Sequence, residues 1–363
     1  MKFKAEKEKL LALIDHASGV IEKRNTIPIL SNIMLIAEDG RLAIVATDLD
    51  LTVHDEIDAV DIATPGRITV NSQTFSSLLR KMPQGNISIR AEDGRMHIVS
   101  GRISYKIPTL PADDYPHATG PDGSGIEIET ADVERAFRLV RSFMSTEETR
   151  YYLNGAYLAV ENGLLVAVAT DGHRMSVAKI ADNQLPVTNV IVPRKTVAEV
   201  LKIISGYDGK MLVTLDERKI EMQIGKLTIT SKLVDGTYPE YQRVIPTKTD
   251  ITIKVEPKVL AEAIDRVNVV STEKTRAVEV VARDGVLFIR ANNPDTGNAE
   301  EEVPADVSAP IRVGYNGRYL LDVLMAYSDK DQIIISMMDA GSPALIVPYV
   351  GSVDRSILMP MRI

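Results

Sequence analysis

The chain has 363 residues, a formal net charge of −8 and no cysteine, and 45% of its residues are hydrophobic. The lack of cysteine excludes a disulfide scaffold and the thiolate class of zinc site. The acidic balance argues against a protein coated by nucleic acid over its whole surface, although it allows a locally basic face. The charged opening, MKFKAEKEKLL, does not resemble a signal peptide, and no apolar run is long enough to span a membrane. We therefore expect a cytosolic protein without a membrane partner.

The chain opens with a short strand followed by an amphipathic helix, and this unit recurs. Residues 3–6 lead into Leu10 and Ile14, which lie four apart on one helical face. Residues 253–264 repeat the pattern, and residues 126–143 repeat it less regularly. The three copies predict the beginnings of three similar domains.

A β-hairpin is also repeated three times. Residues 30–53, 153–177 and 278–302 each contain an alternating apolar run, a tight turn and a second alternating run. The turns fall at Asp39-Gly40, Asn162-Gly163 and Asp284-Gly285. A pattern that occurs three times predicts a repeat architecture.

Each third then continues with a second strand and helix and a closing group of strands. The second strand–helix passages begin at Ile68, Val190 and Ile311. Each third should therefore hold two helices and roughly eight strands, which predicts an α+β fold dominated by antiparallel sheet. Loops rich in Pro, Gly and Asp suggest domain boundaries. We place the three domains at residues 1–122, 123–248 and 249–363.

Basic residues recur on the expected helices although the chain is acidic overall. Arg135, Arg138 and Arg141 recur every three residues and so share one helical face. Other expected helices carry Lys7, Lys9, Lys23, Arg24, Arg80, Lys81, Arg194, Lys195, Lys202, Lys258, Arg266 and Arg318. A solvated face is one interpretation. The other is a shared surface that binds phosphate backbones without reading bases.

The chain lacks the glycine-rich phosphate loops and the nucleophile elbow of common enzymes. Its five histidines are scattered, without the spacing of a metal site, so we expect no metal. Residues 170–174, TDGHR, are the one stretch that suggests acid–base chemistry. However, Asp48 occupies the repeat position of Asp171 without a companion histidine, which favours a turn-forming role for Asp171. A hydrolase that uses Asp171 and His173 remains the alternative.

The C-terminal stretch, residues 356–363, is apolar to its last residue, whereas chain ends are more often polar. One interpretation is a closing strand that completes the third core. Pro360 weakens it for the final residues, because proline donates no hydrogen bond to a ladder. The other interpretation is an adaptable apolar pocket for peptides, since methionines flank that proline. The residues alone leave both open.

Several motifs, in order along the whole chain, carry a resemblance to a known family. They are the opening MKF, RYYLNG at 150–155, ATDGHR at 169–174, VPRK at 192–195, SKLVDG at 231–236, YP at 238–239, RV at 243–244 and MPMR at 359–362. Together they closely resemble the bacterial DNA polymerase III beta subunit family, the sliding clamps.

The resemblance implies the DNA-clamp fold, with three similar domains per chain, each with two helices packed on antiparallel sheets. Two chains would form a head-to-tail homodimer, because heterologous contacts that close produce a ring. The ring would encircle duplex DNA independently of sequence and tether the replicative polymerase, with no catalytic activity and no cofactor. The polymerase subunit, the clamp loader and repair proteins would bind through short linear peptides.

The resemblance also implies a peptide pocket between the second and third domains. The positions that match it are Leu153, Thr170, Gly172, His173, Arg174, Met175, Pro239, Arg243, Val244, Tyr319, Pro343, Ile357, Leu358, Met359, Pro360, Met361 and Arg362. Two of them depart from the family pattern. Met175 stands where the family often has leucine, and Pro343 where it often has a small polar residue, so both positions could alter which peptide anchor is preferred.

Two further sets of residues follow from the resemblance. The DNA contacts would be Lys23, Arg24, Tyr151, Tyr152 and Lys195. The dimer interface would join Ile103, Tyr105 and Ile107 to Val269 and Val270, with Arg102 and Lys106 opposite Glu300, Glu301 and Glu302. For one tyrosine of the pair 151–152, an ordinary strand position is the alternative, because neighbours in a strand face opposite ways. A scaffold that binds peptides but not DNA also remains possible.

Overall fold

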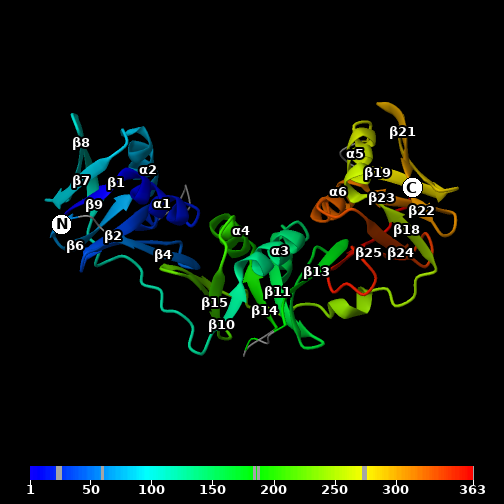
Figure 1. The fold of residues 1–363 in the computed structure, drawn as a ribbon, viewed down its shortest axis with the longest axis horizontal. Coiled ribbons are helices and arrows are strands. Elements are labelled where there is room, and N and C mark those ends of the chain that lie inside the picture. The colour runs from blue at the N-terminus through cyan, green and yellow to red at the C-terminus, as the bar shows by residue number, and fades with distance from the viewer. Residues whose placement is uncertain (22–26, 59–60, 183–184, 186–188, 272–275, 363) are drawn as a thin grey trace. The chain divides into compact units, whose positions relative to one another are not determined.

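The computed structural model describes residues 1–21, 27–58, 61–182, 185, 189–271 and 276–362. In these residues, helices pack on antiparallel sheets (Figure 1), so the predicted α+β class is confirmed. No helix in the described part of the chain is long and apolar enough to cross a bilayer. Each third begins with a strand followed by a helix, as the sequence predicts.

The first third contains two α-helices. Its elements are β1 (Lys2–Glu6), α1 (Lys7–Ser18), the 3-10 helix η1 (Pro28–Ser31), β2 (Asn32–Glu38), β3 (Arg41–Thr47), β4 (Leu51–Asp58), β5 (Asp61–Thr64), β6 (Gly66–Asn71), α2 (Ser72–Lys81), β7 (Asn86–Glu92), β8 (Arg95–Ser100) and β9 (Ile103–Leu110). The helices α1 and α2 lie side by side (Figure 1). Leu10, Leu13 and Ile14 of α1 are each about 1% exposed, so this face forms the core that the spacing predicts.

The second third repeats this order. Its elements are β10 (Ile126–Glu129), α3 (Thr130–Arg141), the 3-10 helix η2 (Glu148–Leu153), β11 (Gly155–Glu161), β12 (Leu164–Thr170), β13 (Arg174–Ala181), β14 (Val190–Pro193), α4 (Arg194–Ile204), β15 (Lys210–Leu215), β16 (Lys219–Ile224) and β17 (Leu227–Lys232).

The last third repeats it again, after a connecting segment that contains a short 3-10 helix. Its elements are η3 (Tyr241–Val244), β18 (Ile251–Val255), α5 (Pro257–Asn268), β19 (Ala277–Arg283), β20 (Val286–Asn293), β21 (Gly297–Pro304), β22 (Asp306–Val307), β23 (Ile311–Asn316), α6 (Gly317–Ala326), β24 (Ile333–Met337), β25 (Ala344–Val347) and β26 (Arg355–Leu358). In Figure 1, α5 and α6 lie side by side, as α1 and α2 do.

The three predicted hairpin turns have the backbone that their sequences favour. Both central residues of each turn have positive φ: 50° and 76° at Asp39-Gly40, 52° and 81° at Asn162-Gly163, and 53° and 79° at Asp284-Gly285. Positive φ at both positions matches the right-handed twist of the flanking strands. The three hairpins are therefore confirmed at the level of their backbone.

Side-chain caps begin two equivalent helices. Asn71 Oδ1 accepts a hydrogen bond of 3.0 Å from the Thr74 N–H at the start of α2. Asn316 Oδ1 accepts from the N–H groups of Arg318 (3.1 Å) and Tyr319 (3.2 Å) at the start of α6. Asparagine satisfies N–H groups that have no partner within the helix, which explains where each helix begins.

The described residues pack as two compact units, although the sequence repeats three times. One consists mainly of Met1–Ala131 and Ala198–Leu233, and the other of Asp132–Gln184, Thr188–Val197 and Val234–Ile363. The second third is divided because its two groups of strands join different neighbours. β17 pairs with β4 in a thirteen-stranded sheet of the first unit, and β13 pairs with β26 in a nine-stranded sheet of the second.

We predict that replacing Gly163 with alanine lowers the free energy of unfolding by about 1–2 kcal/mol, because a Cβ disfavours positive φ. Urea unfolding followed by circular dichroism would measure the change. Gly341→Ala is the control, since Gly341 lies outside the positive-φ region and a Cβ there would meet only the Asp339 carboxylate at an ordinary 3.5 Å. Equal midpoints for the two variants would contradict this account of the turn.

Candidate functional site

The turn between β12 and β13 holds residues 170–174. Asp171 Oδ1 accepts hydrogen bonds from the backbone N–H groups of His173 (2.9 Å) and Arg174 (3.0 Å). Thr170 Oγ1 donates to the Arg174 carbonyl (2.7 Å). Asp48 closes the equivalent turn between β3 and β4 in the same way. The predicted turn-forming role of Asp171 is confirmed.

Arg174 ties this turn to two other elements. Its side chain is 8% exposed, and its Nε donates to Asp171 Oδ2 at 3.0 Å. Its two terminal nitrogens donate at 2.6 Å to Asp322 Oδ2 on α6 and to the Ser142 carbonyl just after α3. The guanidinium carbon also lies 4.4 Å from the centre of the Tyr319 ring. A buried guanidinium with this many partners acts mainly as a structural joint.

The arrangement gives no support to a hydrolase. The Asp171 carboxylate is occupied by the turn and by Arg174. The His173 ring is exposed and stacks on Tyr319, with ring centres 5.9 Å apart. In the described residues, no hydrogen bond or ion pair joins the imidazole to a carboxylate, and no group of three metal-binding side chains comes together. The turn therefore lacks the paired acid and base that hydrolysis needs.

An apolar cluster lies beside this turn and contains three residues of the expected pocket. Leu153 (5% exposed), Met175 (2%) and Ile357 (1%) belong to it, together with Tyr238 and Tyr241. Met175 and Ile357 are direct partners in the β13–β26 ladder. Both are too deeply buried to offer much surface, so Met175 would influence a ligand mainly through the shape of the pocket floor.

A segment of the chain before β18 adds further expected residues. Pro239, Arg243 and Val244 flank the two buried tyrosines, and Val244 is 49% exposed. Arg243 pairs only with its neighbour Glu240, and both side chains are mostly exposed. These residues therefore present exposed surface next to the apolar cluster. Pro343 is half-buried and directly precedes β25, which pairs with β26.

The C-terminal tail leaves β26 and continues past the turn. Leu358 is 1% exposed, so the strand interpretation holds up to that residue. The strand ends before Pro360, as proline requires. Met359 is 41% exposed, and its N–H donates to the His173 carbonyl at 3.0 Å. The tail therefore lies against the turn, with an exposed methionine beside the half-buried Pro360.

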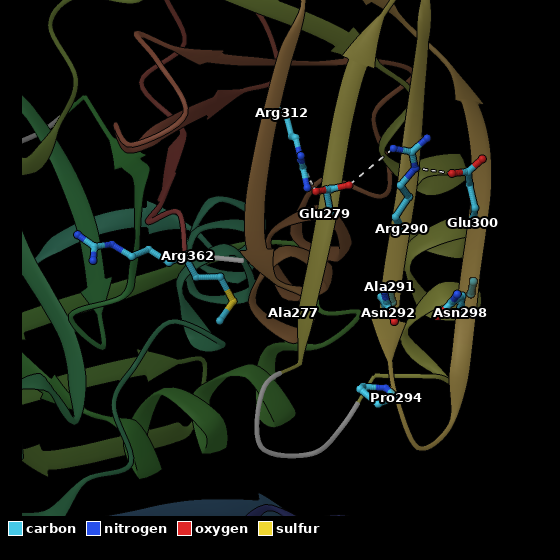
Figure 2. Close-up of a pocket in the computed structure, with 12 residues that line it drawn as sticks. Ala277, Glu279, Arg290, Ala291, Asn292, Pro294, Asn298, Glu300, Arg312 and Arg362 are labelled. Atoms are coloured by element: carbon cyan, nitrogen blue, oxygen red, sulfur yellow. Dashed lines mark hydrogen bonds and ion pairs between the residues drawn. The ribbon is translucent and has the colours of Figure 1, made fainter.

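The last two described residues line a hollow on the four-stranded sheet. The Met361 N–H donates to the Gly314 carbonyl of β23 at 2.9 Å. Met361 and Arg362 line a cavity of about 920 Å³ on the sheet β21-β20-β19-β23, and Figure 2 shows the Arg362 side chain directed away from the charged residues of that sheet. Those residues form a row across the four strands: Arg312, Glu279, Arg290 and Glu300. The resemblance assigns Met361 and Arg362 to the peptide pocket, and in the structure both residues line this hollow.

The expected DNA contacts lie partly outside the described residues, which do not include Lys23 and Arg24. Tyr151 and Tyr152 lie in η2, so the strand alternative for this pair is wrong. Tyr151 is 54% exposed, whereas Tyr152 packs against the apolar cluster, with the two rings edge to face at 5.7 Å. Lys195 lies in the first turn of α4 and is half-buried.

The three arginines of α3 have different surroundings. Arg135 donates to Asp354 Oδ2 at 2.5 Å and to the Lys179 carbonyl at 2.6 Å, so it holds the helix on the sheet. Arg138 pairs with Glu134 one turn earlier. Arg141 is exposed. The regular spacing therefore predicts a shared face correctly but does not reveal that Arg135 and Arg138 are already paired.

The two edges expected at the dimer interface are open. Residues 103–108 of β9 pair with β8 on one side, and a second neighbour, β6, reaches only Thr109 and Leu110. At the end of the four-stranded sheet, β21 has β20 as its one partner strand among the described residues. Ile103 is 36% and Val269 80% exposed.

Several expected interface residues are already engaged within the chain. Ile107 is 8% exposed and so packs in its own core. Tyr105 and Val270 are half-buried. Glu301 pairs with Arg266, whose hydrogen bond lowers the pKa of that carboxyl, and Glu300 pairs with Arg290. Arg102 and Lys106 would therefore compete with partners that Glu300 and Glu301 already have.

Three family models match the chain in succession. They describe the N-terminal, central and C-terminal domains of the DNA polymerase III beta subunit and cover residues 1–119, 127–240 and 242–362. The chain belongs to the DNA polymerase III beta subunit family. The beta sliding clamps of Caulobacter vibrioides (38% identical) and Escherichia coli K12 (35%) match over 100% of both chains. These relatives make the chain a sliding clamp of three domains with a processivity role.

Solved structures of the family match as closely. The DNA polymerase sliding clamp of Caulobacter crescentus has a TM-score of 0.91 at 38% identity, with 100% of both chains covered. A Pseudomonas aeruginosa sliding clamp, bound to griselimycin, has a TM-score of 0.93 at 34% identity, again over 100% of both chains. The clamp fold expected from the resemblance is therefore confirmed.

Sequence reasoning missed several residues that hold the elements of the clamp's candidate pocket in place. Asp322 and Asp354 each hold a buried or half-buried arginine from far along the chain, and no local pattern marks them. For Tyr238 and Tyr241 the sequence carries a weak signal of burial, since large aromatic side chains in a loop are often at least partly buried. Only the structure shows that both are buried.

We predict that Arg174→Lys lowers the clamp's free energy of unfolding by about 2–4 kcal/mol, because lysine cannot replace a buried guanidinium that bonds to two carboxylates and a carbonyl. Thermal unfolding monitored by circular dichroism would measure the loss. Arg243→Lys is the control, since that exposed pair should contribute less than about 1 kcal/mol. A melting temperature unchanged by Arg174→Lys would refute the proposal that Arg174 stabilises the fold by connecting the turn to α6 and to the Ser142 carbonyl.

Proposed function

We propose that this clamp is a head-to-tail homodimer that closes around duplex DNA and holds the replicative polymerase on it. The domains are residues 1–122, 123–248 and 249–363. The first two family matches fall inside these limits, and the third, residues 242–362, begins seven residues before the third domain. The protein acts in the cytoplasm without catalysis and without a cofactor. The observation that carries the proposal is the agreement of fold, length and sequence with sliding clamps along the whole chain.

The two open edges support ring closure. Among the described residues, β9 in the first third and β21 in the last third each leave backbone groups without a partner strand, and such edges readily pair with another chain. Pairing β9 of one protomer with β21 of the next is a heterologous contact. Such contacts form a closed ring when the rotation that relates one protomer to the next brings the last protomer back to the first. Val269 and Ile103 supply exposed apolar surface beside these edges.

Sequence-independent DNA binding is supported by exposed Tyr151 on η2 and exposed Arg141 on α3. Tyr151, Lys195, Arg141, Lys23 and Arg24 are the residues that we assign to this contact, with Tyr152 as a support for Tyr151. Contacts between cations and phosphates are screened by salt and do not depend on sequence. A ring held by such contacts would slide along DNA, and its retention would come from topology.

The peptide pocket lies at the apolar cluster and the β12–β13 turn. Exposed His173, Val244 and Met359 surround a buried floor, which suits an apolar anchor in an extended peptide. The Pseudomonas aeruginosa clamp bound to griselimycin shows that the fold accepts a ligand. The polymerase subunit, clamp loader and repair proteins would bind here through short peptides.

We predict that Val269→Glu weakens the dimer at least tenfold, because it places a charge in an apolar contact. Sedimentation equilibrium over a range of protein concentrations would give the dissociation constant. Val350→Glu is the control: Val350 is 85% exposed, much like Val269 at 80%, but lies in the loop between β25 and β26. Equal dimer strength in both variants would contradict the proposed interface.

We also predict that Met359→Ala weakens binding of a peptide that carries the clamp-binding segment of the polymerase subunit by about tenfold. Removing most of a side chain that is buried on binding costs roughly 1–2 kcal/mol. Isothermal titration calorimetry would measure the affinity. Met325→Ala, on the exposed side of α6, should leave the affinity unchanged, and an equal loss in both variants would exclude a specific role for Met359.

A further inference from the structure

The connecting segment, residues 234–245, carries one wall of the candidate pocket. It contains Pro239, Arg243 and Val244, the exposed residues described above. Its buried side packs on the nine-stranded sheet through Tyr238 and Tyr241, and half-buried Val234 and Ile245 flank them. The position of this segment relative to the β12–β13 turn therefore sets the width of the pocket.

One contact that holds the segment comes from β11. The ring of Tyr157 stacks on that of Tyr238, with centres 4.5 Å apart and planes only 2° from parallel. The Tyr157 hydroxyl donates to Asn189 Oδ1 at 2.9 Å, which fixes the ring in the plane of the stack. A stacked pair of this geometry contributes more than its buried area alone. Tyr157 thus fixes one end of the segment.

A second contact comes from the same strand. The Tyr241 hydroxyl donates to Glu161 Oε2 at 3.4 Å. Glu161 also accepts from Arg355 Nη2 through both oxygens, at 2.5 and 2.7 Å, and the Arg355 side chain is only 12% exposed. Burial, and then the nearby Glu161 carboxylate, raise the pKa of Tyr241. The hydroxyl therefore stays protonated at neutral pH and remains a donor.

The two contacts belong together because of strand geometry. Tyr157 and Glu161 are four residues apart on β11, so their side chains lie on the same face of the sheet. Arg355 lies two residues before Ile357, whose side chain is part of the pocket floor. The strand that holds the wall is therefore linked through Glu161 and Arg355 to the strand that forms the floor.

We infer that Tyr157 and Glu161 are positioning residues that set the distance between wall and floor, and so determine which apolar anchor the clamp accepts. This inference rests on the proposed peptide-binding function. Neither residue is expected to touch the peptide. A wall held in place before binding favours one anchor size, whereas a loosened wall accepts larger anchors and binds the preferred one less tightly.

The test uses the full-length clamp and the variants Glu161→Gln, Tyr241→Phe and their combination. Two synthetic peptides that differ only in one anchor side chain, leucine or phenylalanine, are titrated calorimetrically. We expect each single variant to weaken binding of the preferred peptide three- to tenfold and to change the ratio of the two affinities at least threefold. Because both changes break one linkage, the double variant should be no weaker than the weaker single variant.

Hydrogen exchange measured on the same proteins without peptide reports how firmly the connecting segment is held. Amide exchange in residues 234–245 should be about tenfold faster in each variant. Arg312→Gln is the control, because it breaks a more exposed arginine–glutamate pair on the four-stranded sheet, and it should alter neither exchange nor affinity. Unchanged exchange in Glu161→Gln and Tyr241→Phe would overturn the inference whether or not the peptides bind. If the unaltered clamp binds neither peptide, the proposed function fails, while exchange still decides the positioning role.

Discussion

Two short antiparallel ladders join the three repeated domains, and the rest of the structure depends on them. Thr228–Ser231 of β17 pair with Leu51–His54 of β4, and Arg174–Val177 of β13 pair with Arg355–Leu358 of β26. A β-strand at the edge of a sheet carries unpaired backbone N–H and C=O groups. These groups either pair with a neighbouring strand or remain available for pairing with another chain. Within the chain each domain pairs an edge with the next domain. Among the described residues, residues 103–108 of β9 and the strand β21 each have a partner strand on one side, and in the proposed dimer a second copy of the chain pairs with the other side.

The β13–β26 ladder also explains where the candidate pocket lies. It places the turn at residues 170–174 directly beside the C-terminal tail, and it buries Met175 and Ile357 between them. Arg174, at the start of β13, then fastens α6 to this ladder through Asp322. The pocket is therefore built on rigid strands, and its more exposed residues come from the tail and from the connecting segment. This division of roles suits a site that must accept several peptides while keeping one binding mode.

Local features of the fold could be predicted from the sequence because local rules determine them. Turn glycines such as Gly40, helix caps such as Asn71 and the repeated apolar alternation each depend on a few neighbouring residues. The ladders between domains could not be predicted, since any exposed strand edge could pair with any other. Arg135 shows a similar limit: its spacing predicts a helical face, but its partner Asp354 lies more than two hundred residues away.

The candidate site could be recognised through resemblance but not built from the residues alone. Resemblance pointed to Met175 and Ile357, yet only the structure shows that they are buried in one apolar cluster, and that the buried Arg174 binds Asp322 of α6. It also assigned Met361 to the pocket, and only the structure shows that the N–H of this residue donates to β23. The roles of these residues depend on their burial and on contacts with residues far away in the sequence. Neither can be predicted from the spacing of residues along the chain.

The central claim is that two copies of this chain close into a ring around duplex DNA. Negative-stain electron microscopy of the purified protein, with class averaging, tests it most directly because it shows assembly and central opening together. The account predicts annular particles with a hole wide enough for a DNA duplex. Compact particles of single-chain size, persisting at high protein concentration, would contradict it.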